Sequence, residues 1–383
     1  MSDLPRTADV VVIGGGVVGC SIAYNLAKRG VKEVVLLEKG SLCCGSTGRC
    51  AAGIRAQWGT EMNCRLGKAS LDIFETLSEE LGMDVGLYQG GYLMIAYTEK
   101  ELEQLKKNVA LQNSLGIRSK MISLDEAREL SPHLNPEGAL GFFFHHRDGH
   151  ADPFLTTFAY AEAAKRLGVR IFRFTQCVGI EVESGRIRAV KTNRGEIHTR
   201  VVVNAAGGYS QDVAAMAGVS IPTYPEVHEI MVTEPVERFA QPMHMSFSGN
   251  FYIMQRPHGS VIMGYGPEEH EKSYECGNTV EFMEVMARKA VKLLPVMRGL
   301  RVVRHWSGLY DMTPDKQPII CEADEVKGFF IATGFSGHGF MFGPITGVVV
   351  AEMIMGEEPS VPVHMLHYRR FACGELILEP AVV

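Results

Sequence analysis

The sequence predicts an α/β protein in which a Rossmann-like nucleotide-binding domain is interleaved with an α+β domain that carries a mixed sheet. Three observations predict this fold class. The 383 residues exceed the size at which one hydrophobic core usually stops growing. A glycine-rich turn near the start lies between an apolar strand and a helix. A second strand, glycine turn and helix follow near the end, and no linker divides the chain.

The first expected element is a buried parallel strand, because residues Asp9 to Ile13 form a near-continuous apolar run. A helix is expected from Ser21 to Arg29, and a second apolar strand from Glu33 to Leu37. This order of strand, helix and strand is typical of a dinucleotide-binding unit.

The glycines between the first strand and the helix each have a physical task. Gly14 allows the tight turn, Gly16 lets backbone N–H groups approach a pyrophosphate, and Gly19 lets the helix pack against the strand. Glu38, at the end of the second strand, can accept hydrogen bonds from a ribose. The motif predicts a dinucleotide site but does not distinguish NAD from FAD.

The composition argues against several classes of function. A formal charge of -6, with lysines and arginines scattered among acidic residues, offers no basic surface for nucleic acid. The N-terminal apolar run lacks a basic flank and contains glycines, so neither a signal peptide nor a membrane span is expected. Nine cysteines without regular spacing are expected to be reduced thiols. We therefore expect a cytoplasmic protein.

The stretch from Ser41 to Gly59 is rich in cysteine and glycine. Its cysteines lack the spacing of a zinc site and no histidine lies nearby, so no metal is expected. We interpret Cys43, Cys44 and Cys50 as small, buried, inert side chains beside a ligand. The loop from Gly45 to Gly48 follows the second strand, where the far half of a dinucleotide would cross the sheet edge.

The middle of the chain alternates between helical and strand-like patterns. Asp152 is expected to cap a helix that begins at Pro153 and runs to Leu167. The other helices are expected at residues 61–80, 99–115 and 280–294, and strands at residues 90–97, 177–183, 186–192 and 201–205. Strand-like patterns from 221 to 256 and from 260 to 265 are assigned to the second domain.

The closing elements repeat the opening pattern. Residues 329–332 are expected to form a strand, Gly334 to Gly339 a glycine turn, and Pro344 to Met355 a helix with proline near its start. The N–H groups of this turn would stabilise negative charge on the pyrimidine edge of a reduced flavin. This part of the chain therefore favours FAD over NAD.

Several motifs together resemble a known superfamily. They are GSTGRCAAGIR after the glycine turn and Glu38, DGHADPFLTTFAYAEAA, VVVNAAGGYS, HWSGLYDMTPDKQPII and GFFIATGFSGHGFMFGPITGVVVAEMI. The chain resembles the FAD-dependent D-amino-acid-oxidase-like superfamily, in its glycine and sarcosine oxidase group. Within this group the motifs are most similar to the β subunits of dye-linked L-proline dehydrogenase and of heterotetrameric sarcosine oxidase.

The resemblance implies a discontinuous FAD-binding domain, residues 1–85, 145–218 and 312–383, and a substrate-binding domain, residues 86–144 and 219–311. It also implies non-covalently bound FAD. The residues expected to bind it are Gly14, Gly16, Val17, Val18, Gly19, Glu38, Lys39, Gly45, Ser46, Thr47, Arg49, Cys50, Ala52, Gly53, Val178, Ala206, Gly207, Gly308, Gly337, His338, Gly339, Phe340 and Met341.

In this superfamily an amino acid lies over the flavin and its carboxylate pairs with an arginine. The resemblance assigns that role to Arg55, because a guanidinium holds a carboxylate with two hydrogen bonds; a surface or backbone-pairing arginine is the alternative. Tyr252 matches a substrate-facing tyrosine, with a core tyrosine as the alternative. His338 is expected beside the flavin, and His228 and His258 are further candidates for tuning amine protonation.

The sequence departs from the superfamily at four positions. Met341 replaces a lysine that binds the substrate carboxylate in sarcosine oxidases. Met263 is expected where monomeric sarcosine oxidase has a lysine that activates oxygen, so a dehydrogenase is expected rather than an oxidase. Gly308 and Ala151 stand near the positions that attach flavin covalently in relatives, so extractable FAD is expected.

The resemblance implies oxidation of an amino acid or N-alkyl amino acid of the L-proline or sarcosine type. Hydride would pass from the α-carbon or the N-alkyl carbon to flavin N5. The chain would be the catalytic subunit of a hetero-oligomer with an α subunit, an FMN at a subunit interface and further electron-transfer subunits. An FAD-carrying relay or assembly subunit and an NAD-dependent dehydrogenase are the alternatives. The substrate, the partner subunits and the final electron acceptor stay open.

Overall fold

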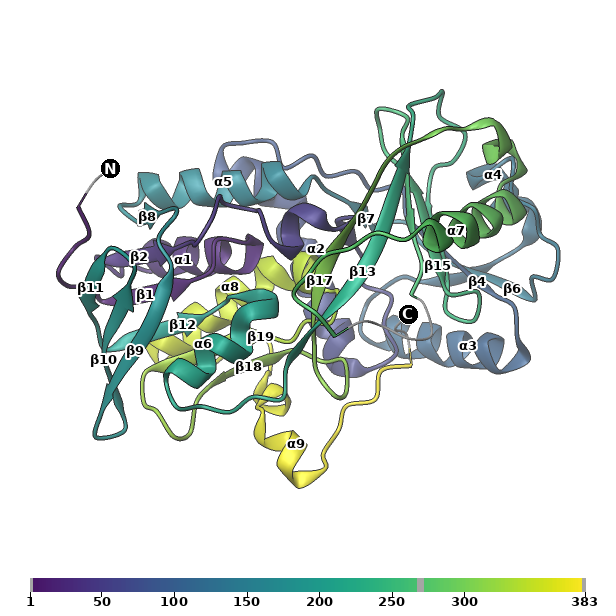
Figure 1. Cartoon of the computed structure of the whole chain (residues 1–383). Coiled ribbons are helices and arrows are strands. Elements are labelled where there is room, and N and C mark those ends of the chain that lie inside the picture. Colours follow the sequence, from purple (N-terminus) through teal and green to yellow (C-terminus); the bar gives the residue numbers. More distant parts are fainter. Residues whose placement is uncertain (1–2, 267–271, 381–383) are drawn as a thin grey trace.

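The computed structural model describes residues 3–266 and 272–380. Two large sheets organise the molecule, and each forms the centre of one of its two parts (Figure 1). The chain passes between these parts several times, so neither sheet is built from one continuous segment. The α/β fold class is confirmed, with both parallel and antiparallel pairing.

The first sheet is Rossmann-like. Its strands run in the order β18, β19, β12, β1, β2 and β8. Their bounds in that order are Ile319–Glu322, Phe329–Thr333, Val201–Asn204, Val10–Ile13, Val34–Leu37 and Arg170–Phe172. All pairings are parallel except that of the edge strand β18. Every residue of β1 and β2 is buried, which explains the uninterrupted apolar runs in the sequence.

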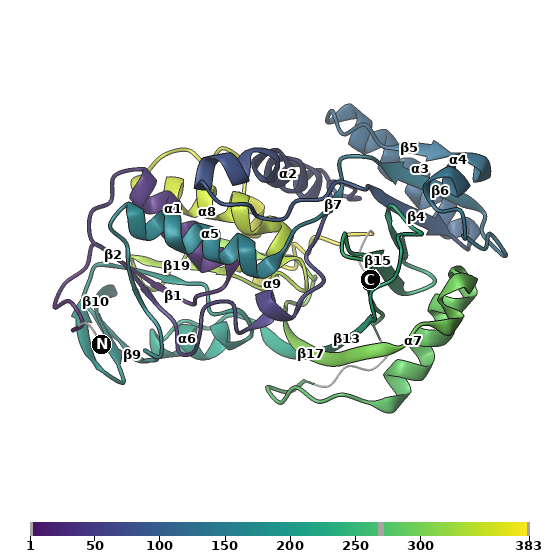
Figure 2. The ribbon, with the colours of Figure 1, turned by 90° about the horizontal axis from the view of Figure 1, so that it is seen from above.

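Helices cover one face of this sheet, and a smaller sheet covers the other (Figure 2). The helices are α1 (Val17–Lys28), α2 (Glu61–Leu81), α5 (Pro153–Arg166) and α8 (Gly339–Met355). The opposite face carries α6 (Ser210–Met216) and the antiparallel strands β9 (Cys177–Glu183), β10 (Arg186–Thr192) and β11 (Gly195–His198). Helices α1 and α8 pack so closely that a Cβ at Gly347 would overlap Ser21 Oγ.

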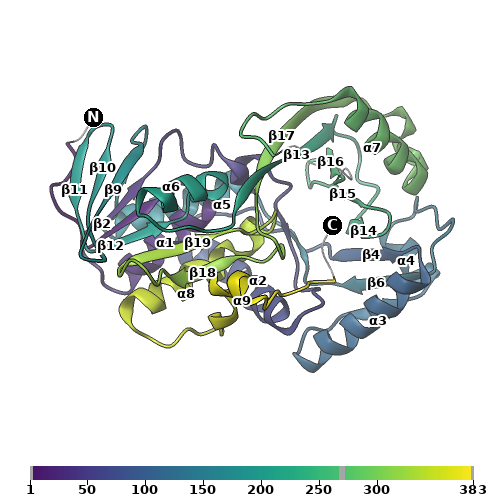
Figure 3. The ribbon, with the colours of Figure 1, turned by 60° about the horizontal axis from the view of Figure 1, so that its bottom comes forward.

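The second sheet has eight strands in the order β17, β13, β16, β15, β14, β4, β6 and β5. Their bounds in that order are Val302–Met312, Tyr224–Thr233, Val261–Gly264, Phe251–Gln255, Met243–Ser246, Tyr92–Ala96, Gly141–His145 and Lys120–Ile122. The sheet is mixed because β14 and β4 are parallel and their neighbours are antiparallel. The long strands β13 and β17 reach toward the first part of the molecule (Figure 3).

Helices also cover the second sheet. Helices α4 (Leu124–Leu130) and α7 (Val280–Leu293) pack in one hydrophobic cluster on this sheet, and α3 (Glu99–Ser114) contributes Leu105 to another. The remaining elements of the described residues are β3 (Gly53–Ile54), which pairs with β7 (Gly149–His150), helix α9 (Arg369–Cys373), and short 3₁₀ helices at Ser46–Arg49, Gly207–Tyr209, Pro295–Gly299 and His364–Leu366. Within the described ranges, no helix is long and apolar enough to cross a membrane.

The closing helix differs from its prediction. It begins at Gly339 and not at Pro344, which lies inside it and removes the N–H that would bond to Phe340 O. The left-handed turn at Gly337 (φ 91°) already directs the chain into the helix. Helix α4 was not predicted, although Ser123 and Glu126 form a capping box at its start. The predicted cap at Asp152 is present, because its carboxylate accepts hydrogen bonds from two N–H groups of α5.

Candidate active site

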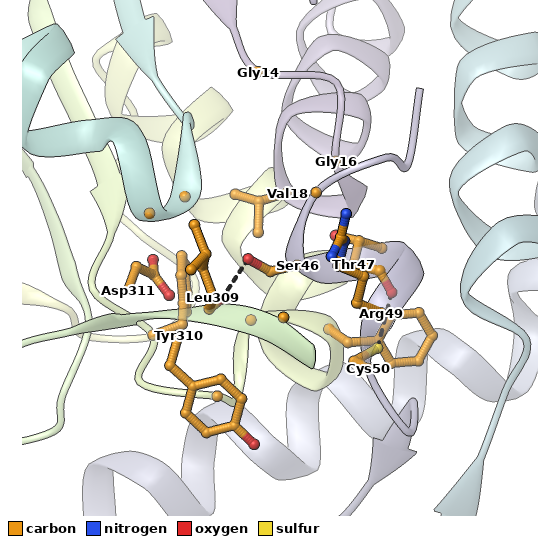
Figure 4. Close-up of a pocket in the computed structure, with 18 of the residues that line it drawn as sticks. Gly14, Gly16, Val18, Ser46, Thr47, Arg49, Cys50, Leu309, Tyr310 and Asp311 are labelled. Atoms are coloured by element: carbon orange, nitrogen blue, oxygen red, sulfur yellow. Dashed lines mark hydrogen bonds between the residues drawn. The ribbon is translucent and has the colours of Figure 1, made fainter. Parts of the chain in front are cut away.

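A cavity of about 740 Å³ lies where the two parts of the molecule meet. Its floor follows the carboxyl ends of β1, β2 and β12, where α/β proteins of this kind bind ligands. Its roof comes from β13, β14, β15 and β17 of the second sheet. Figure 4 shows the glycine turn and the loop at residues 46–50 on one side and β17 on the other.

The glycine turn has the geometry of a phosphate cradle. Gly14 adopts φ 117°, and a Cβ there would overlap Ala205 O. A Cβ at Gly19 would overlap Gly14 O, and one at Gly16 would lie 3.0 Å from Thr47 Oγ1. Only glycine fits at Gly14 and Gly19 without a backbone shift, whereas a side chain at Gly16 would displace the Thr47 side chain. The turn thus leaves backbone N–H groups and the N-terminus of α1 beside the cavity, which suits the pyrophosphate of a dinucleotide.

Glu38 holds the same turn from the end of β2. Its Oε2 accepts a hydrogen bond from Gly15 N at 2.8 Å, and its Oε1 accepts one from Gly40 N at 2.6 Å. The residue lines the cavity, so its carboxylate is near the space assigned to the ribose. Glu38 is predicted to bind the ribose, and its carboxylate also holds the backbone of the glycine turn in place.

The loop at Ser46–Arg49 connects the floor of the cavity to strand β17 of its roof. Ser46 Oγ donates to Leu309 O at 2.5 Å, and Arg49 Nη1 donates to Ser307 O at 2.8 Å. Trp306 Nε1 in turn donates to Arg49 O at 2.9 Å. These hydrogen bonds fix the two parts of the molecule relative to each other along the cavity.

The cysteines of this stretch are not alike. Cys43 is buried, Cys50 is half-buried and Cys44 is exposed, so the expectation that all three are buried is confirmed only for Cys43. Cys50 lines the cavity and donates its thiol to Thr47 O at 3.0 Å. Burial raises the pKa of the Cys50 thiol to about 12, so this side chain stays protonated and unreactive. No group of three or more metal-ligating side chains occurs in the part of the chain that the structure describes.

The N-terminus of α8 forms one wall of the cavity through residues 337–341. Asp311 fixes the turn before it, because its Oδ2 accepts hydrogen bonds from Gly334 N at 2.7 Å and Thr333 Oγ1 at 3.1 Å. A Cβ at Gly337 would overlap the ring of Tyr310. Burial, with a smaller effect of Arg55, lowers the pKa of His338 to about 3, so its imidazole is neutral.

Arg55 is buried at the edge of the same cavity, with 1% of its surface exposed. This burial rules out a surface arginine. Its guanidinium lies 3.8 Å from the centre of the Trp58 ring, and its Nη1 lies 3.5 Å from Gln57 O and 3.8 Å from Met245 Sδ. Burial lowers the pKa of Arg55, but an arginine remains charged in any such environment.

A buried carboxylate supports the segment that carries Arg55. Asp148 Oδ1 accepts a hydrogen bond from Ala56 N at 2.8 Å, and Asp148 Oδ2 accepts one from Gln57 Nε2 at 3.0 Å. His145 Nδ1 lies 2.7 Å from the same carboxylate. This network orients the backbone beside Arg55.

The roof carries aromatic and titratable side chains over the cavity. The ring of His228 stacks on that of Tyr310, with centroids 3.7 Å apart, and His228 Nε2 lies 3.0 Å from Glu226 Oε1. Burial raises the pKa of Tyr310 to about 12 and raises that of Tyr252 as well, so both phenols are neutral. His258 is exposed and lies outside the cavity lining.

The cavity brings together nearly all the predicted site residues, including Arg55, Tyr252 and His338. Three predicted residues do not line it. Val17 lies behind the turn, where its N–H donates to Thr47 Oγ1 at 3.3 Å, and Gly19 serves helix packing. The side chain of Val178 is 52% exposed. At that place the cavity is lined by Thr175, Gln176 and Cys177.

Sequence reasoning missed most of the roof, and it misplaced Met263. Met263 is buried in the hydrophobic cluster on the far side of the second sheet from the cavity. Its neighbour Ile262 packs with Met243 and Met245, which do line the cavity. A count of residues from Tyr252 therefore ended on the wrong face of the strand, because side chains alternate between faces. The other missed residues, such as Tyr92, have no local motif in the sequence.

The fold and the site together define a dinucleotide-dependent oxidoreductase, with a glycine cradle for the cofactor and a buried cation at the far end of the cavity. The family described as FAD dependent oxidoreductase (DAO) matches residues 9–353. The chain belongs to this family, and its cofactor is therefore FAD.

Three proteins illustrate the similarity. The sarcosine oxidase subunit beta of Rhodobacter capsulatus is 30% identical over 97% of this chain and 90% of that protein. Human mitochondrial sarcosine dehydrogenase is 31% identical over 96% of this chain, which spans 42% of that protein. The crystal structure of L-proline dehydrogenase from P. horikoshii superposes with a TM-score of 0.94 at 38% identity, covering 98% of this chain and 100% of that one.

Proposed function

We propose that this protein oxidises an amino acid or an N-alkyl amino acid of the L-proline or sarcosine type, with FAD as the electron acceptor. The observation that carries the proposal is the buried Arg55 guanidinium at the edge of a cavity that also contains the glycine cradle. A substrate carboxylate suits this site, because a guanidinium at the edge of the cavity can bind it with two hydrogen bonds.

The residues between the cradle and Arg55 define the space for the reacting carbon. Bound FAD would accept a hydride from the carbon next to the substrate nitrogen. The N–H groups at the start of α8 would stabilise the negative charge that collects on the cofactor, and His338 is neutral, so this stabilisation would come from N–H dipoles and not from an imidazolium. Asp311 keeps this turn in place through Gly334 N.

The substrate amine must lose its proton before hydride can leave, since a protonated nitrogen has no lone pair. We assign the proton acceptor to His228, which lines the cavity and stacks on Tyr310. Glu226 Oε1 lies 3.0 Å from His228 Nε2, so the carboxylate would stabilise the imidazolium that forms. Tyr252 would orient the amine through its neutral phenol.

The remaining roof residues favour a small substrate with an apolar body. Tyr92, Ile230, Met243 and Met245 present aromatic rings, an aliphatic chain and thioethers to the cavity. Such side chains exclude water from the reacting atoms and fit a pyrrolidine ring or an N-methyl group. Met341, at the start of α8, supplies no second cation for the carboxylate.

We propose a dehydrogenase rather than an oxidase, and a hetero-oligomeric one. The cavity-side residue beside Met263 is Ile262, which is apolar and offers no positive charge to assist oxygen reduction. Two relatives are named as β subunits, which supports an α-type partner in a cytoplasmic complex. The domain ranges given above and an FMN at a subunit interface stay predictions.

An anaerobic screen tests the function. Amino acids and N-methyl amino acids are mixed with the purified yellow protein, and the flavin absorbance is followed. L-proline or sarcosine is expected to bleach the flavin within seconds, and a dye acceptor should restore it. Absence of bleaching by every amine would contradict the proposal and support an FAD-carrying relay subunit instead.

Non-covalent attachment of FAD is a separate part of the proposal. Gly308 lines the cavity without any nucleophilic side chain. Acid precipitation should therefore leave the yellow colour in the supernatant, and a yellow pellet would show a covalent bond.

A further inference from the structure

We propose that the C-terminal segment 375–380 supports the substrate site from outside the cavity, and that Glu379 is a positioning residue for Arg55. The inference rests on the proposed function, because it concerns the binding of the substrate carboxylate. Segment 375–380 is separated from Arg55 by more than three hundred residues of sequence, yet it is held against the loop that follows Arg55.

Glu379 is a buried carboxylate with an unusually complete set of donors. Its Oε1 accepts a hydrogen bond from Gly59 N at 2.7 Å. Its Oε2 accepts hydrogen bonds from Thr60 N at 3.1 Å, Thr60 Oγ1 at 2.7 Å and Asn63 Nδ2 at 2.8 Å. Only 7% of the residue is exposed. The donors come from the loop at residues 59–60 and from the first turn of α2, so this carboxylate, which has exchanged water for hydrogen bonds, holds that loop firmly.

A second anchor holds the same segment from behind. Arg370 forms a bidentate ion pair with Asp315, through Nε–Oδ2 at 2.8 Å and Nη2–Oδ1 at 3.0 Å. Ile377 N donates to Asp315 Oδ2 at 3.2 Å. Asn63 also donates to Gln317 Oε1 at 2.8 Å, so the two anchors belong to one polar network. The position of Glu379 is therefore set by buried contacts and not by the exposed part of the segment.

The loop held by Glu379 leads directly to the arginine. Trp58 Nε1 donates to Arg55 O at 3.2 Å, and the Trp58 ring lies against the guanidinium. The same ring contacts His338 edge-on, with centroids 4.8 Å apart. Asp148 holds this segment at Ala56 and Gln57, and Glu379 holds it at Gly59 and Thr60. Two buried carboxylates thus hold the chain before and after Trp58, and Arg55 lies over the ring of this tryptophan.

Replacement of the carboxylate by an amide tests the positioning role. In Glu379→Gln, either orientation of the amide places its NH₂ against an N–H donor of the loop, so the loop must shift. We expect the Kd of pyrrole-2-carboxylate, a carboxylate that cannot deliver hydride, to rise about tenfold in titrations of the flavin spectrum. KM for the substrate should rise similarly, with kcat changed less than threefold and the ratio of FAD to protein unchanged.

Two controls separate positioning from general stability. Glu375→Gln removes an exposed carboxylate from the same segment and should leave the Kd unchanged. In an Arg55→Ala background, Glu379→Gln should change the Kd less than twofold, because its effect passes through Arg55. An undiminished tenfold loss in that background, or wild-type affinity in Glu379→Gln alone, would overturn the inference.

Hydrogen exchange in the wild-type protein tests the same inference and does not depend on whether a Glu379 variant folds. In the wild-type protein, pyrrole-2-carboxylate should slow amide hydrogen exchange in residues 376–380 as well as in 55–63, because coupling is reciprocal. Unchanged exchange in 376–380 alongside protection of 55–63 would overturn the inference and leave the proposed function intact. A wild-type protein that binds no carboxylate and whose flavin no amine bleaches would overturn both.

Discussion

The two ends of the cavity are built in different ways. The nucleotide end is organised around backbone groups, namely the glycine turn at Gly14–Gly19, the N-terminus of α1 and the turn before α8. The substrate end is made of side chains that come from distant segments, such as Arg55, Tyr252 and His228. The cofactor is common to the family, whereas substrates differ among the named relatives. Backbone recognition suits the constant ligand and side-chain recognition suits the variable one.

The largest expected effect is the loss of FAD binding when the glycine turn at the nucleotide end of the cavity is altered. Gly14→Ala should destabilise the protein by about 3 kcal/mol and abolish FAD binding, because φ is 117° and the new Cβ overlaps Ala205 O. The ratio of FAD to protein and the thermal midpoint measure both effects. Gly30→Ala is the matched control, since Gly30 also has positive φ but no atom lies within 4 Å of its Cβ position. It should cost only about 1 kcal/mol and retain FAD.

The second largest effect is a loss of carboxylate affinity at the substrate end of the cavity, with FAD binding retained. Arg55→Ala should raise the Kd for a carboxylate ligand about 100-fold, since a charged hydrogen-bonding partner is lost. FAD should stay bound, because Arg55 lies beyond the glycine cradle. Arg65→Ala, which removes an exposed arginine paired with Glu61, should leave the Kd unchanged. Equal affinity in wild type and Arg55→Ala would reject the assignment.

A pH series compares two histidines, the half-buried His338 in the cavity wall and the buried His244 in the second sheet. Burial lowers the pKa of His338 to about 3 and that of His244, in the second sheet, to about 4. Below pH 6.5 each of these histidines takes up a proton in the unfolded chain but stays neutral in the folded protein. Stability should thus fall by up to about 1.4 kcal/mol per pH unit per histidine, until the pH reaches the folded pKa.

The variants His338→Asn and His244→Asn isolate the two contributions. Each should flatten the dependence of the unfolding free energy on pH between 6.5 and 4, as measured by urea denaturation. An unchanged slope in both variants would show that neither histidine is kept neutral by the fold.

The smallest expected effect concerns how fast the reduced flavin reacts with oxygen at the substrate end of the cavity. Ile262→Lys places a cation on the cavity side of β16 and should raise the rate at which the reduced flavin reoxidises in air, about tenfold. Ile262→Met, neutral and similar in size, should leave that rate unchanged. If both variants reoxidise at the wild-type rate, missing positive charge is not the reason for slow reaction with oxygen.

The sequence predicted the nucleotide end almost completely because its signals are local. The apolar run of β1, the glycine turn and Glu38 all lie between Val10 and Glu38, and backbone geometry allows few other structures for this combination. One expectation there was wrong, because Cys44 is exposed and was expected to be buried. The contact of Val178 with the cofactor stays a prediction, and its exposed side chain leaves only its backbone for that contact.

The substrate end was predicted only where the resemblance supplied a residue. Arg55 and Tyr252 were identified in this way, whereas Tyr92 and Met245 carry no motif. Met263 shows the limit most clearly. A shift of one residue along a strand moves a side chain to the other face, and residue counting cannot detect such a shift.

By itself the sequence determined the fold class and the dinucleotide cradle, and its resemblance to the superfamily indicated the arginine proposed to bind the carboxylate. These features depend on local backbone geometry and on continuous motifs. Only the tertiary structure decided which side chains cover the cavity, that His228 is supported by Glu226, and that Glu379 is held against the loop beside Arg55. These contacts join residues that are distant in sequence or depend on the face of a strand, so only the folded packing of the two sheets sets them.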